Sequence, residues 1–115
     1  LDSHIAFVNS NTGRILLTQP VGLRDIVGVA YSPKSGHLYA VDLAAAQPAE
    51  GGLFRLDAVR SERGLSVAAT KIASIERPTA LAFTSTGMLF ITTLGPATAD
   101  QSKPNGTLIR IPPGL

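Results

Sequence analysis

The chain has 115 residues, 44% of them apolar, with ten basic and eight acidic side chains, a formal net charge of +2 and no cysteine. The charges are scattered singly apart from a small basic group at Arg60 to Arg63, which argues against a nucleic-acid-binding stripe. The absence of cysteine excludes disulfides, thiolate catalysis and cysteine zinc clusters. No run approaches the ~18 consecutive apolar residues of a membrane helix. We therefore expect neither nucleic acid nor a membrane as a partner, while the compartment stays open, an extracytoplasmic one included.

Short strand signals separated by turn residues follow one another along the chain, and no window shows a convincing helical period. Turn chemistry marks Asn11 to Gly13 and Pro33 to Gly36, and Arg60 to Gly64 has the composition of a solvated surface loop. The pattern predicts an all-β fold. Its strands are expected at residues 4–9, 14–19, 26–32, 37–42, 53–57, 66–75, 79–84, 88–93 and 107–111.

The chain repeats itself. The segment Gly28 to Asp42 returns as Ala80 to Thr93, and the Gly-Leu-Phe-Arg-Leu run that ends at Leu56 returns as Gly-Thr-Leu-Ile-Arg-Ile near the C-terminus. The repeating unit is therefore about 52 to 55 residues long, a period typical of repeat architectures. Aromatic residues recur at equivalent positions, Tyr31 with Phe83 and Tyr39 with Phe90, so each pair is expected to fill the same packing position in its unit.

Four antiparallel strands per unit are the sequence signature of a β-propeller, in which neighbouring sheets cover both faces of each blade. The near-continuous apolar run Ile26 to Tyr31 fits a strand that is buried on both faces. We assign residues 1–23 to the end of one blade, 24–75 to a full blade and 76–115 to most of the next. The chain is thus predicted to be a propeller fragment of about two and a quarter blades, with apolar faces that promote self-association. An alternative is a ring closed by copies of the chain, which nine strands fit poorly.

The motifs Gly28-Val-Ala-Tyr-Ser-Pro, Gly36-x-Leu-Tyr-x-x-Asp and Pro78-Thr-Ala-Leu-Ala-Phe resemble blades of the NHL and gluconolactonase-like (senescence-marker-protein-like, strictosidine-synthase-like) propellers. The resemblance implies six blades and a parent protein of about 300 residues. The superfamily includes lactonases, esterases, sugar dehydrogenases and plain binding scaffolds, so the resemblance indicates architecture more than function. Its lactonase branch places a metal-binding Asn or Asp where this chain has Val27 and Thr79, which counts against a metal-dependent lactonase.

Antiparallel connectivity places the two long predicted loops, Leu43 to Gly52 and Leu94 to Asn105, on the same face. Long loops on a rigid scaffold commonly carry binding sites. Five charged residues are expected on that face near the central channel and are the candidate ligand-binding residues: Arg24, Asp25, Asp42, Glu76 and Arg77.

Two interpretations remain open for these charges. Asp42 ends a strand at the rim of the face, so it is either a turn-capping aspartate or a ligand-binding carboxylate. Arg24-Asp25 and Glu76-Arg77 reverse their charge order between the repeats, so they either pair across neighbouring blades or line an ion-binding channel.

No catalytic signature is present in the sequence. His4 and His37 stand apart from other potential ligands or bases, and there is no nucleophile elbow, phosphate-binding glycine loop or zinc-protease motif. Catalytic residues are therefore unassigned, no metal site is predicted and no cofactor is evident. The leading hypothesis is a propeller that acts as a binding or scaffold protein for a small molecule, glycan or protein on its long-loop face. The alternative is a fragment of a propeller hydrolase or sugar oxidoreductase whose active site lies largely in the remaining blades.

Overall fold

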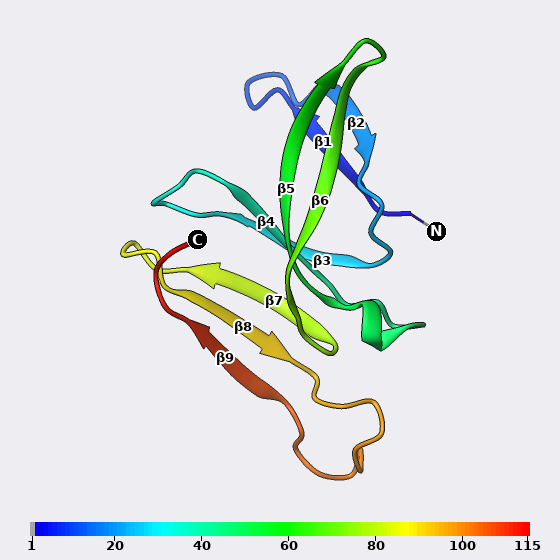
Figure 1. The fold of residues 1–115 in the computed structure, drawn as a ribbon, viewed down its shortest axis with the longest axis vertical. Coiled ribbons are helices and arrows are strands. Elements are labelled where there is room, and N and C mark those ends of the chain that lie inside the picture. The colour runs from blue at the N-terminus through cyan, green and yellow to red at the C-terminus, as the bar shows by residue number, and fades with distance from the viewer. Residues whose placement is uncertain (1) are drawn as a thin grey trace.

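Three antiparallel β-sheets stack face to face in the computed structural model, which describes residues 2–115 (Figure 1). The prediction of an all-β fold is confirmed. Among the described residues the strands and the single short 3-10 helix are β1 (His4–Val8), β2 (Ile15–Pro20), β3 (Ile26–Tyr31), β4 (Leu38–Asp42), η1 (Pro48–Glu50), β5 (Gly52–Ser61), β6 (Gly64–Ser74), β7 (Pro78–Phe83), β8 (Leu89–Thr93) and β9 (Thr107–Ile111).

Each sheet is built from strands that are consecutive in the chain. The N-terminal sheet holds β1 and β2, the central sheet holds β3, β4, β5 and β6 in that order, and the C-terminal sheet holds β7, β8 and β9. Every neighbouring pair is antiparallel. Short segments join β2 to β3 and β6 to β7 between the sheets, and the two long connections inside a sheet come before β5 and before β9.

The central sheet is covered on both faces, because its side chains alternate between two cores. Tyr39 and Val41 of β4 face the C-terminal sheet, whereas Ala40 faces the N-terminal sheet. As a result four consecutive residues, Tyr39 to Asp42, are at most 2% exposed. One core consists of Tyr39, Val41, Leu53, Ile75, Leu89 and Ile91, and the other of Val21, Leu23, Ala40, Phe54 and Leu56.

The first strands of the central and C-terminal sheets, β3 and β7, lie side by side. They approach closely because Gly28 has no side chain: a Cβ at this position would lie only 2.9 Å from Cδ2 of Leu81. In the other repeat the equivalent residue is Ala80, which is also small. The repeat therefore keeps little side-chain bulk at the point where adjacent sheets meet.

Both chain ends are tied to the sheets. The Ser3 hydroxyl accepts a hydrogen bond from Ile26 N–H at 3.0 Å, and the Ser3 N–H donates to Leu23 O at 2.7 Å. At the other end, the buried hydroxyl of Ser32 donates to Leu115 O at 2.6 Å. The Leu115 side chain packs against the core between the central and C-terminal sheets.

The β5–β6 hairpin differs most from the sequence prediction. The segment Arg60 to Gly64 is exposed, as predicted, but the predicted loop is too long: β5 runs to Ser61 and β6 starts at Gly64, with only two residues between them. Charged residues do not distinguish the two structures, because the exposed tip of a hairpin accepts them as well as a loop does. The short helix η1 inside the first long loop was also not predicted. No helix in the described residues is long and apolar enough to cross a membrane.

Leu53→Ala should lower the free energy of unfolding by about 2–5 kcal/mol, because Leu53 is fully buried between two sheets and truncation leaves a cavity. Urea denaturation followed by circular dichroism measures this change. Leu108→Ala is the matched control, since Leu108 is 64% exposed, and should change stability by less than about 0.5 kcal/mol. Equal effects of the two substitutions would contradict the assignment of this core.

Candidate functional site

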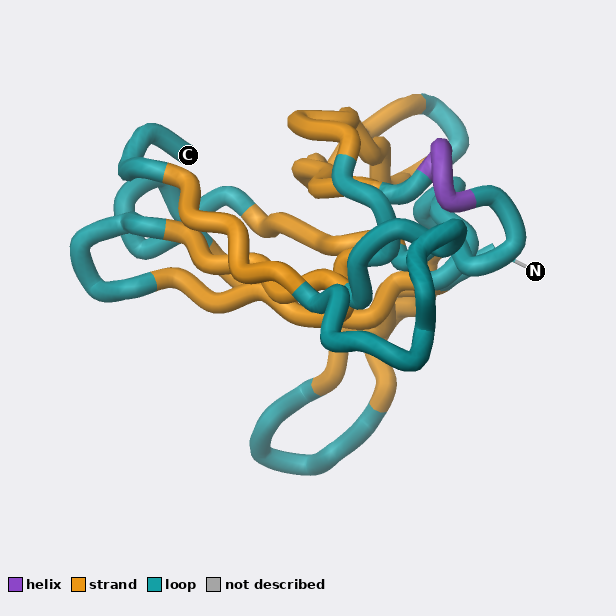
Figure 2. The backbone as a smooth tube through the Cα atoms, turned by 90° about the horizontal axis from the view of Figure 1, so that it is seen from below, coloured by secondary structure: helices purple, strands orange, loops and turns teal. Residues whose placement is uncertain are grey.

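The two long loops lie at the end of the sheets opposite the β3–β4 and β7–β8 turns, as expected from the connectivity (Figures 1 and 2). Figure 2 shows η1, which belongs to the first of these loops, at the end of the molecule away from the C-terminus. Each loop follows a buried polar residue that ends a strand: Asp42 is the last residue of β4, and Thr93 is the last residue of β8. This end is called the long-loop face below.

Asp42 joins three segments through its carboxylate. Its Oδ1 accepts hydrogen bonds from the N–H groups of Asp25 at 2.9 Å and Ala44 at 3.0 Å, and its Oδ2 accepts one from Arg24 N–H at 3.2 Å. Asp42 is only 2% exposed, so these bonds replace the water that the carboxylate loses on burial. They also hold Ala44 in the left-handed region, with φ at 46°. The structure thus shows Asp42 capping the loop, and its role in binding a ligand stays a prediction.

Thr93 takes the same place in the second repeat with a shorter side chain. Its Oγ1 accepts a hydrogen bond from Gly95 N–H at 3.2 Å and lies 2.6 Å from Oγ1 of Thr107. Gly95 has φ at 83°, and a Cβ there would collide with the backbone oxygen of Asn105. Thr93 therefore fixes the start of its loop and also connects it to the strand at the loop's end.

The two acidic residues before the first strands support the loops in the same way, despite their reversed order in the sequence. Asp25 Oδ2 accepts a hydrogen bond from Ala45 N–H at 2.8 Å, and Glu76 Oε1 accepts one from Ala97 N–H at 3.1 Å. The longer glutamate side chain compensates for a position one residue earlier in its repeat. Sequence comparison identified both carboxylates but missed this shared role.

The two arginines of the candidate set do not form the pairs that were expected across the repeats. Arg24 Nε lies 2.9 Å from Oε2 of Glu50, in the first long loop. Arg77 Nη1 donates to Gly95 O at 3.4 Å, in the second. Each arginine thus contacts the loop of its own sheet, because that loop folds back over the start of the first strand.

A pocket of about 360 Å³ lies between the two long loops. It brings Arg77 together with Gln101, a residue that the sequence analysis did not single out. The other lining residues are apolar: Leu43, Ala45, Leu94 and Ala97. The pocket therefore combines apolar walls with one cationic group and one amide.

Two further grooves adjoin this end of the molecule. One of about 320 Å³ runs along η1, and one of about 260 Å³ runs along the ends of β8 and β9. Ser74, Ile75 and Glu76 line both grooves, so this segment lies between the two grooves. Of the five candidate residues, the structure brings Arg77 and Glu76 to concave surface, whereas Asp42 is used inside the fold.

The second long loop also has internal order. Asp100 Oδ1 accepts hydrogen bonds from the hydroxyl of Ser102 at 2.6 Å and from its backbone N–H at 2.9 Å. These bonds lower the pKa of the fully exposed Asp100 carboxyl below 3.8. The stability that these two hydrogen bonds give to the folded loop is therefore complete above the ordinary pKa of an aspartate. It is lost as the pH falls through the lowered pKa of Asp100.

The described residues contain no group of three or more His, Cys, Asp and Glu side chains that could hold a metal ion. His4 Nδ1 lies 3.1 Å from Asp2 O, and the ring of His37 lies 6.5 Å from that of Tyr39. Comparison of the chain with protein-family models, curated proteins and solved structures gave no match in any of the three.

Asp42→Ala should lower the free energy of unfolding by at least about 2 kcal/mol, because one buried and two part-buried N–H groups lose their acceptor. Amide hydrogen exchange should rise at Arg24, Asp25 and Ala44. The control is Asp42→Thr, which copies the second repeat and should restore protection at Ala44 but not at Arg24 or Asp25. Uniform loss of protection in both variants would argue against this set of contacts.

Gly95→Ala should destabilise the second long loop, because a Cβ meets the Asn105 backbone and the positive φ disfavours alanine. We expect a loss of about 1–3 kcal/mol in thermal or urea unfolding. Gly13→Ala is the matched control: Gly13 has φ at 73° but open space around its Cβ position, so it reports the backbone cost alone. A Gly95→Ala variant no less stable than Gly13→Ala would disprove the clash.

Proposed function

We propose that the three sheets are successive blades of a β-propeller and that this chain acts in binding, with a small organic anion held between its two long loops. The observation that carries the binding proposal is the pocket that joins Arg77 and Gln101 to apolar walls. Binding on a face of long loops with a supporting scaffold is the usual arrangement in proteins of this shape.

The propeller proposal is supported by the arrangement of the sheets. The central sheet has four antiparallel strands in chain order and apolar neighbours on both faces. Its first strand, β3, lies beside the first strand of the next sheet, β7, as inner strands do around a central channel. Further blades are expected to cover the remaining faces, and six blades of the NHL or gluconolactonase-like kind remain our hypothesis for the parent protein.

The chemistry of the pocket favours an anion. The Arg77 guanidinium has five N–H donors and donates one hydrogen bond to Gly95 O, which leaves other donors for a carboxylate. The Gln101 amide can donate or accept beside it, although its NH₂ group currently donates to Ala99 O at 2.8 Å. Apolar walls from both loops suit a flat hydrocarbon body, so an aromatic or short aliphatic carboxylate matches both features.

Titration with benzoate, followed by two-dimensional NMR of the ¹⁵N-labelled chain, tests this proposal. Benzoate should shift amides of residues 43–45, 77 and 94–101 with a dissociation constant near the millimolar range, about −4 kcal/mol. The uncharged benzamide should bind at least about tenfold more weakly. Arg77→Gln should abolish the preference for benzoate, because it removes the cation and keeps most of the side-chain stem.

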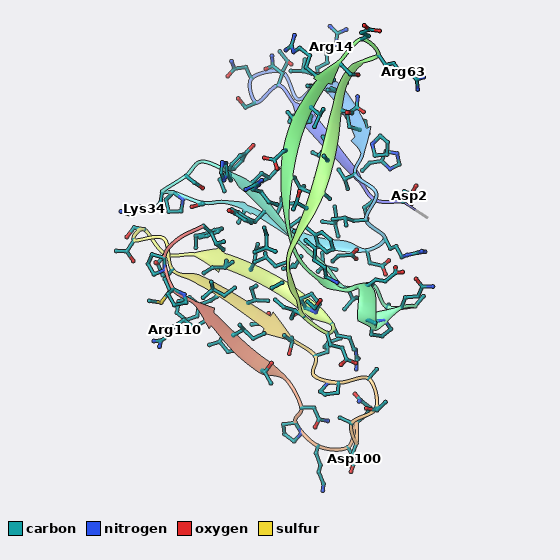
Figure 3. All side chains as sticks on the ribbon, in the orientation of Figure 1. Asp2, Arg14, Lys34, Arg63, Asp100 and Arg110 are labelled. Atoms are coloured by element: carbon teal, nitrogen blue, oxygen red, sulfur yellow. The ribbon has the colours of Figure 1, made fainter. Side chains whose placement is uncertain are left out.

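Arg14→Gln is the control for the loss of one positive charge, since Arg14 and the second long loop lie at opposite ends of the molecule in Figure 3. It should leave benzoate binding unchanged. Equal binding of benzoate and benzamide, or equal loss in the Arg14 and Arg77 variants, would overturn the assignment of an anion site to this pocket.

A further inference from the structure

One edge of β1 has no strand partner within residues 2–115. In the central sheet, β5 pairs with β4 on one side and β6 on the other, whereas β1 pairs only with β2. β1 holds the place in its sheet that β5 holds in the central sheet, because each is followed by a hairpin partner that ends the sheet. Two strand positions, equivalent to β3 and β4, are therefore unfilled beside β1.

The neighbouring surface of β3 is apolar and uncovered. Val29 and Tyr31 are 48% and 64% exposed. They face a groove of about 380 Å³ whose opposite wall is formed by residues 4–7 of β1. An exposed apolar stripe next to a free strand edge is the combination that a docking strand needs, because it offers both hydrogen-bonding groups and area to bury.

The second repeat shows what covers these positions. Leu81 and Phe83 of β7 are the counterparts of Val29 and Tyr31, and both pack against the hairpin β3–β4 of the preceding sheet. The ring of Phe83 lies 5.7 Å from that of Tyr39, and Leu81 fills the space left by Gly28. The same covering hairpin placed before β3 would set a small residue over Val29 and an aromatic ring near Tyr31.

We infer that the groove between β1 and β3 is a docking site for a β-hairpin with the pattern of residues 26–42. The second strand of this hairpin pairs antiparallel with the free edge of β1, as β4 does with β5. Its first strand lies on Val29 and Tyr31 and carries a glycine or alanine at the crossing. This inference uses the repeat alone and does not depend on ligand binding at the long-loop face.

A second copy of this chain is a poor occupant. Its C-terminal sheet would have to enter as three strands, β7, β8 and β9, where only two positions are unfilled. β9 would then occupy the place of β1, which is already paired with β2 and packed on the central sheet. A two-stranded hairpin fits without displacing any strand.

A synthetic peptide of residues 26–42 is the direct probe. Added to the full chain, it should slow hydrogen exchange of the β1 amides within residues 4–8 that face the free edge. Val29→Asp in the full chain should weaken peptide binding at least about tenfold, because the carboxylate would be buried under the hairpin. Leu108→Asp is the control, at an exposed strand position outside the groove (64%, against 48% for Val29), and should bind the peptide normally.

A peptide variant with Gly28→Leu tests the crossing residue and should bind at least about tenfold more weakly. A tandem chain, with a copy of residues 26–51 placed directly before Ser3, removes the cost of association and should unfold at a higher temperature than the original chain. Val29→Asp, made in the original part of the tandem chain and not in the added copy, should remove this increase in unfolding temperature.

Three results would overturn the inference. Protection of β1 that is unaffected by Val29→Asp would place the peptide elsewhere. A tandem chain with unchanged stability would show that the hairpin does not dock. Concentration-dependent protection of β1 without peptide, together with a dimer in sedimentation velocity, would make a second copy the occupant instead.

Discussion

The burial of the central sheet on both faces is the constraint on which the rest of this structure depends. A sheet with one wet face would alternate polar and apolar residues, but Tyr39 to Asp42 are all buried. Ala40 is fully buried although it is small, because the neighbouring Phe54 and the N-terminal sheet fill the space around it. At about 25 cal/mol per Å² of apolar surface, most of the burial is gained only when adjacent sheets are in contact. The sheets are therefore expected to fold cooperatively.

Because the central sheet is buried on both faces, polar side chains at the ends of its strands need hydrogen-bond partners inside the protein. Asp42 completes a buried strand, so its carboxylate must find donors inside the protein. It takes them from backbone N–H groups of the segment before β3 and of the loop after β4, and thereby fixes both. In the second repeat, Thr93 has a single side-chain oxygen, which accepts only one backbone hydrogen bond, from Gly95 N–H. Its other side-chain hydrogen bond is with the hydroxyl of Thr107. The scaffold thus accepts different loops while it keeps the strand end buried.

The repeat made the strands predictable because it doubled each signal. Strands that recur with equivalent aromatic positions, such as Tyr31 and Phe83, were placed to within one or two residues of the structure. The extent of the β5–β6 hairpin could not be predicted, since its tip lies outside both cores and carries no apolar pattern. The shared role of Asp25 and Glu76 could not be predicted for another reason. Glu76 lies one position earlier in its repeat than Asp25 does, so the order of the charges looks reversed, but its longer side chain reaches the equivalent N–H group.

Arg77 supports the second long loop from a strained backbone, and it is also the cation of the binding site that we propose. Its backbone has φ at 54°, a conformation that costs a non-glycine residue about 1 kcal/mol or more. Two contacts maintain it, because its carbonyl accepts Leu94 N–H at 3.0 Å and its guanidinium donates to Gly95 O. Asp25 makes the equivalent backbone contact to Leu43 without a positive φ. Loop attachment alone therefore does not require the strained backbone of Arg77. The second repeat differs in that Arg77 also lines the pocket between the loops, so our proposal gives this strained residue a second role beside loop attachment.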